Sequence, residues 1–125
     1  MSQSRIEKIE TILKELLETT PNIKGCALIT MDGFAISSVL PADVNEEIVA
    51  GLATAMVGVG ERFATQMLRD HMDQIYIKTK NGYAILNLIS SDVILVLLTN
   101  EKIKLGLAFL ELKEPIKKLH GLVQT

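Results

Sequence analysis

The feature that most constrains this chain is the run of residues 93–99, in which every position from Val93 to Leu98 is apolar. Successive side chains of a β-strand point to opposite faces of the sheet, so a strand of this kind must be covered on both faces. The segment at residues 74–80 instead alternates apolar with polar residues. The apolar run therefore predicts a central strand with helices on both sides of the sheet, which is a three-layer α/β (α+β) sandwich.

Four more strands are predicted from short β-rich runs separated by turn residues. Asp32-Gly33 and Asn81-Gly82 are dipeptides that tolerate the positive φ angles of tight hairpin turns. Strands joined by such turns are antiparallel, so a five-stranded antiparallel sheet is expected. The predicted strands are residues 25–31, 34–40, 74–80, 83–89 and 93–99.

Three helices are predicted around these strands. Apolar residues at three- and four-residue spacing predict an amphipathic helix over residues 3–19. A long second helix is capped by Asp43 or Asn45 and continues to Leu68, and a third covers residues 101–119. The order αββαβββα places the long helix on one face of the sheet and the two terminal helices on the other.

Helical projection predicts which residues of these helices are buried. The bulky apolar residues of the long helix form one stripe, which is expected to lie on the sheet. The rest of its surface carries small residues where Lys and Glu would be usual, and Gly58 and Gly60 are interpreted as sites of close packing. The expected stripe is Ile48, Leu52, Met56, Val59, Phe63 and Met67. The residues expected to be buried in the last helix are Ile103, Leu107, Leu110 and Ile116.

Composition and charge argue against several classes of protein. With 125 residues, 48% of them hydrophobic, the chain is expected to be one domain, residues 1–125, that buries a core. Its 13 basic and 15 acidic side chains give a net charge of -2, which argues against nucleic acid as a partner. The lone cysteine, Cys26, suits a reducing compartment. No signal peptide or membrane-spanning run is expected, and the cytoplasm is favoured.

Residues that carry catalytic or metal chemistry are sparse. His71 and His120 are the only histidines, and neither has a cysteine or a second histidine at ligand spacing. Cys26 is interpreted as a core residue and His71 as a partner of a helix C-terminal dipole. Asp32 is interpreted as a turn residue, with a carboxylate in a pocket as the alternative. We therefore expect no enzyme, and no catalytic, cofactor-binding or metal-binding residue.

Three segments carry a resemblance to a known family. They are residues 25–33 (GCALITMDG), the alanine- and glycine-rich second helix, and Lys104-Leu105-Gly106-Leu107 at the start of the last helix. Together with the element order, they resemble the Roadblock family, named for a dynein light chain. The resemblance implies a non-enzymatic scaffold or regulator of Ras-like small GTPases. The family includes a bacterial polarity regulator that stimulates its GTPase as a dimer and supplies no arginine finger.

The resemblance also implies how two chains pair. Roadblock proteins form homodimers or heterodimers by joining their third strands into one sheet, with the second helices side by side. An edge strand with Ile75 and Ile77 invites aggregation unless it is paired, although Lys78 and Lys80 could instead protect the edge of a monomer. The expected dimer interface is Gln74, Ile75, Tyr76, Ile77, Lys78, Ala53, Gly60 and Ala64.

A GTPase is expected to bind the outer face of the paired long helices, where the residues are small. No tail is expected beyond Thr125, so contacts from such a tail would be absent. The alternative function is a small-molecule-sensing domain that holds a metabolite between helix and sheet, and the lack of convergent polar groups in the sequence argues against it. The expected partner-binding residues are Ala50, Thr54, Val57, Gly58, Glu61, Thr65 and Leu68.

Overall fold

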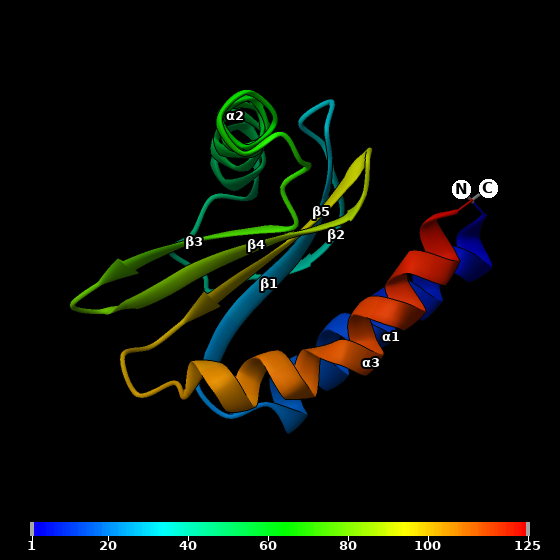
Figure 1. Cartoon of the computed structure of the whole chain (residues 1–125). Coiled ribbons are helices and arrows are strands. Elements are labelled where there is room, and N and C mark those ends of the chain that lie inside the picture. Colours follow the sequence, from blue (N-terminus) through cyan, green and yellow to red (C-terminus); the bar gives the residue numbers. More distant parts are fainter. Residues whose placement is uncertain (1, 125) are drawn as a thin grey trace.

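Five antiparallel strands form one sheet with helices on both faces in a computed structural model of the chain, which describes residues 2–124 (Figure 1). The expectation of no tail beyond Thr125 lies outside the described residues. In chain order the elements are α1 (Gln3–Thr19), β1 (Ile23–Thr30), β2 (Ala35–Val39), α2 (Glu46–Phe63), the π-helix η1 (Ala64–Leu68), β3 (Gln74–Thr79), β4 (Gly82–Ser90), β5 (Val93–Thr99) and α3 (Leu105–Val123).

The sheet separates two apolar layers. Figure 1 shows α2 alone on one face, with α1 and α3 side by side on the other. In β5, Val93, Leu95 and Leu97 belong to the core under α1 and α3, whereas Ile94 and Val96 belong to the core under α2. The apolar run is therefore covered on both faces, and the three-layer sandwich predicted from it is confirmed.

The strand order is β2-β1-β5-β4-β3, with β5 in the centre and all neighbours antiparallel. Both glycine turns have the expected backbone: Gly33 has a φ of 89° and Gly82 a φ of 139°. A side chain at Gly82 would also collide with the carbonyl oxygen of Thr99. The Asn45 side chain caps α2 by accepting a hydrogen bond of 3.0 Å from the Ile48 amide.

The two edge strands differ in regularity. The register of β2 on β1 shifts between Leu28 and Ile29, which face Ser37 and Ala35, so Ile36 is left as a bulge. The other edge strand, β3, pairs with β4 over six consecutive residues without any shift. It therefore presents a straight row of backbone groups along its outer side.

The buried face of α3 differs from the predicted one. Ala108, Leu112 and Leu119 are buried, whereas Leu107 and Leu110 are exposed. The helix begins at Leu105, later than the predicted residue 101, so Ile103 lies in the loop before it. Ile103 still packs against the core as predicted. Within the helix, the spacing of the three buried residues sets the orientation. Ile116 packs against the core as predicted.

This orientation predicts that truncating two leucines of α3 has very different effects on stability. Leu112 is 1% exposed and Leu110 is 61% exposed. Leu112→Ala should lower the free energy of unfolding by about 2–5 kcal/mol, because it leaves a cavity in the core. Leu110→Ala should change it by less than about 0.5 kcal/mol. Urea unfolding followed by circular dichroism measures both, and equal losses would contradict the assigned orientation.

Candidate functional site

The face of α2 that touches the sheet is made of small residues. Ala50, Ala53 and Val57 are buried, and so is Ala64, where η1 continues the helix. The first three pack against β1, β4 and β5 in the core on that face. Short side chains let the helix axis approach the sheet closely, so the predicted orientation of α2, with its bulky stripe on the sheet, is wrong.

All but one of the residues of the predicted stripe instead face away from the sheet; the exception is Met56, which is partly buried and packs against the core under α2. Phe63, for example, is 62% exposed. By length and composition alone the 23 residues Glu46–Leu68 could cross a membrane, but one side of the segment is packed on the sheet. Large apolar residues exposed together on one face of a helix are typical of interaction surfaces. The exposed large apolar residues of this segment are Ile48, Leu52, Val59, Phe63, Met67 and Leu68.

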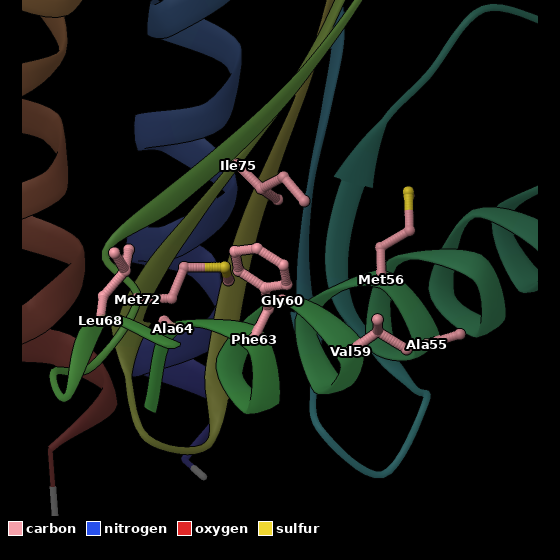
Figure 2. A pocket seen from close by; sticks show the side chains of 9 residues that line it. All are labelled: Ala55, Met56, Val59, Gly60, Phe63, Ala64, Leu68, Met72 and Ile75. Atoms are coloured by element: carbon pink, nitrogen blue, oxygen red, sulfur yellow. The ribbon is translucent and has the colours of Figure 1, made fainter. Parts of the chain in front are cut away.

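A groove of about 620 Å³ lies between this apolar surface and β3. Figure 2 shows Phe63, Met72 and Ile75 reaching into the space between the helix and the strand. Gly60 allows this arrangement, because a methyl group placed on it would lie 2.6 Å from Sδ of Met72. The other residues lining the groove are Ala55, Met56, Val59, Ala64 and Leu68. No charged side chain is among its lining residues, so the groove fits an apolar occupant.

The residues predicted for the dimer interface fall into two groups. Gln74 to Lys78 all lie on the edge strand β3, as predicted. Gly60 and Ala64 line the groove beside it. Ala53, however, is buried against the sheet, so its place in the interface is wrong. Helical projection places Phe63 and Val59 on the core stripe, so neither is predicted for this surface. Met72, which also lines the groove, has no predicted role.

The residues predicted to bind a partner do not form one surface in the folded chain. Ala50 and Val57 are buried in the core, and they are wrong as surface residues because their small side chains are what lets α2 approach the sheet. Leu68 lines the groove beside β3. The remaining four lie on the opposite flank of α2, toward the β1–β2 hairpin, and are partly exposed: Thr54, Gly58, Glu61 and Thr65.

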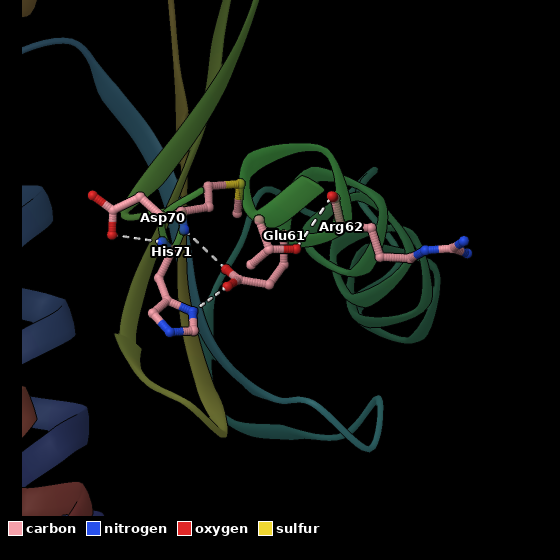
Figure 3. Close-up of polar contacts among 6 residues, drawn as sticks. Glu61, Arg62, Asp70 and His71 are labelled. Carbon is pink, nitrogen blue, oxygen red and sulfur yellow. Dashed lines mark hydrogen bonds and ion pairs between the residues drawn. The ribbon is translucent and has the colours of Figure 1, made fainter. Parts of the chain in front are cut away.

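Glu61 fastens the segment after η1 to α2. Its Oε1 lies 2.6 Å from Nδ1 of His71, and its Oε2 accepts a 3.0 Å hydrogen bond from the backbone amide of Met72 (Figure 3). Figure 3 shows Glu61 and His71 pointing toward each other while Arg62 points away. Arg69, at the end of η1, has a left-handed φ of 58° that turns the chain back toward Glu61. His71 therefore pairs with a carboxylate, an interaction that its neighbours in the sequence do not predict.

This pairing shifts the pKa values of Glu61 and His71 in opposite directions. The hydrogen bond to Glu61, together with its charge, raises the pKa of His71. The hydrogen bonds from His71 and from the Met72 amide lower the pKa of Glu61. The contribution of Glu61 to stability is present above its unfolded pKa and is lost as the pH falls through its folded pKa. That of His71 is present below its unfolded pKa and is lost as the pH rises through its folded pKa.

An NMR titration of the His71 ring tests the pair. Its pKa should lie above the value of about 6.5 expected for an unpaired histidine. Glu61→Gln removes the negative charge and should lower the pKa of His71. Glu47→Gln, which neutralises an exposed carboxylate in the first turn of the same helix, should leave it unchanged. Equal pKa values in all three proteins would contradict the pairing.

Cys26 is confirmed as a core residue. Its Sγ donates to the backbone oxygen of Leu13 over 3.6 Å, and burial raises the pKa of the thiol to about 12. A thiol of this kind is a poor nucleophile at neutral pH. Within residues 2–124, no group of three or more His, Cys, Asp or Glu side chains could hold a metal ion. Asp32 is exposed in the β1–β2 turn, as its interpretation as a turn residue requires.

Known proteins resemble this chain in both sequence and structure. A model of the Roadblock/LC7 domain matches residues 8–99. The uncharacterized protein MJ1340 of Methanocaldococcus jannaschii is 32% identical over 114 residues, which cover 91% of this chain and 98% of that protein. Myxococcus xanthus MglB has a TM-score of 0.89 at 20% identity, over 100% of this chain and 97% of MglB. A Roadblock/LC7 domain from Streptomyces avermitilis has a TM-score of 0.85 at 14% identity, over 93% of this chain and 98% of that domain.

Proposed function

The chain belongs to the Roadblock/LC7 family, and on this premise we propose that it is a non-enzymatic cytoplasmic regulator. In this proposal it pairs with a second copy, or with a paralogue, and binds a Ras-like small GTPase. The observation that carries the proposal is the uncovered apolar face of α2, which continues into the groove beside β3. A protein that worked alone would have no use for this surface, which would be an aggregation hazard.

Self-pairing accounts for the edge strand and the groove together. The outer side of β3 carries unpaired backbone groups in regular register, and a second β3 related by a two-fold axis supplies their partners. The same axis brings the second α2 beside the first. The exposed ring of Phe63 then has the partner's groove within reach, and the apolar lining of that groove suits it.

The pairing is tested by placing a charge in the groove. The protein should have about twice the 13.8 kDa mass of one chain in light scattering at micromolar concentration. Phe63→Arg should shift this mass to that of one chain, because it puts an unpaired charge in an apolar interface. The side chain is exposed in the single chain, so folding should be kept. Ile77→Pro removes a backbone donor from β3 and should also disrupt the pair.

Leu110→Arg is the matched control for this test. It places the same charge on an exposed leucine of α3, on the other face of the sheet, and should leave the mass unchanged. A wild-type protein with the mass of one chain would contradict the pairing. So would a Phe63→Arg protein that keeps the doubled mass.

The outward ridge of α2 is the surface proposed for the GTPase. Ile48 and Leu52 are exposed, and neither lines the groove beside β3, so pairing of two chains through that groove leaves them free. Thr54, from the residues predicted to bind a partner, is partly exposed and follows Leu52 by two residues on the same helix. Apolar residues of this size on a rigid helix are typical anchors of protein interfaces.

Calorimetry with the small GTPases of the source organism, each loaded with GDP or with a non-hydrolysable GTP analogue, tests this surface. One of them should bind, and Leu52→Arg should weaken binding by about 2 kcal/mol, which is roughly thirtyfold in affinity. The variant should remain paired. If the whole panel fails to bind the paired protein, the GTPase assignment is wrong; unchanged affinity of Leu52→Arg would exclude the ridge as the docking site.

A further inference from the structure

A second hollow lies on the flank of α2 that faces away from β3. Its volume is about 580 Å³, and its walls come from the C-terminal half of α2, the β1–β2 hairpin and the β4–β5 turn. A hydrogen bond of 2.8 Å from the Met31 amide to the Asp92 carbonyl joins the hairpin to the turn. We call this space the hairpin-side cavity. Its size is within the range of pockets that hold small molecules.

The inner lining of the hairpin-side cavity is apolar and adaptable. Met31, Val57, Met72 and Leu88 line it. Methionine side chains adjust readily to ligands of different shape. The position of Met72 is set by the hydrogen bond from its amide to Glu61. These four residues come from four segments that are far apart in the sequence.

Gly58 keeps the cavity open. Of the glycines in the middle of α2, Gly60 is explained by its contact with Met72, but a methyl group placed on Gly58 would meet no atom within 4 Å. Glycine inside a helix is less favourable than alanine, so packing within this chain gives no reason for its presence. Because Gly58 lines the cavity, a side chain at this position would occupy space that an entering group could use.

Two polar side chains of the cavity, those of Ser90 and His71, can donate hydrogen bonds to a ligand. Both carboxylate oxygens of Glu61 already interact, with the His71 ring and the Met72 amide. The hydroxyl of Ser90 accepts a bond from the Asp92 amide, which leaves its hydrogen free to donate. The pairing of Nδ1 with Glu61 favours a protonated His71, and within residues 2–124 its Nε2 has no hydrogen-bond partner. Both groups suit a ligand oxygen that accepts hydrogen bonds.

From this geometry we propose that the hairpin-side cavity binds a small amphipathic molecule with an aliphatic body and a carboxylate head. The aliphatic part contacts Met31, Val57, Met72 and Leu88, and the head accepts hydrogen bonds from Ser90 and His71. The cavity is distinct from the groove beside β3, since Met72 is the one residue that lines both. Its rim includes Gly58, Glu61 and Thr65, which are among the residues predicted from the sequence to bind a partner. The inference does not require the protein to bind a GTPase.

Titration of the whole chain with octanoate tests the proposal, with the methionine methyl groups observed by NMR. The methyl signals of Met31 and Met72 should shift saturably. Gly58→Met should weaken octanoate binding at least about tenfold by filling the cavity, and Gly58→Ala should weaken it less. Gly51→Met is the matched control, because Gly51 also has no atom within 4 Å of an added methyl group but does not line the cavity. Its affinity for octanoate should equal that of the wild type.

A comparison of octylamine with octanoate tests the contribution of the head group separately from that of the aliphatic chain. Octylamine carries the same aliphatic chain but a cationic head that cannot accept a hydrogen bond, so it should bind more weakly than octanoate. Equal binding of both would overturn the assignment of the head group. Absence of saturable shifts with octanoate, or equal affinity in the Gly58 and Gly51 variants, would overturn the site itself.

Discussion

The close contact between α2 and the sheet determines which surfaces this protein offers. Ala50, Ala53 and Val57 fill the space between the helix and the strands, and the helix can come near only because these side chains are short. The bulky residues of the same helix cannot share that space. They are placed on the outside, where they form an apolar surface that the single chain does not cover.

The end of this helix is held by polar contacts as well as apolar ones. After the wider π-helical turn and the left-handed Arg69, the chain reverses and is fastened by Glu61 to His71 and Met72. Met72 then lies under the helix at Gly60. Its side chain separates the groove on one flank of α2 from the cavity on the other. One residue thus contributes to two surfaces with different lining chemistry.

The sequence predicted most of the architecture because the relevant signals are local. The apolar run at β5, the two glycine turns and the Asn45 cap each act within a few residues, and all were found where expected. The orientation of α2 could not be deduced in the same way. Both of its faces are apolar, and the choice between them depends on how close the helix must come to strands distant in the sequence.

The candidate surfaces were harder to predict for the same reason. Bulky apolar side chains usually indicate a core, so the sequence predicts Phe63 to be buried, whereas it is exposed. The better signal was the spacing of Ala50, Ala53, Val57 and Ala64, small residues that share one face of the helix. The hairpin-side cavity had no sequence signal at all, because its walls meet only in the folded chain.

The difference between the two edge strands also limits how far an assembly can grow. A chain with two regular edges could add neighbours on both sides without end, as happens in fibrils. Here the bulge at Ile36 interrupts β2, whereas β3 is regular along its whole length. In the proposed pairing, two β3 strands would cover each other's open edge, and only the bulged β2 edges would stay exposed. Such an assembly would stop at two chains. A higher protein concentration would then increase the fraction of paired chains without producing longer assemblies.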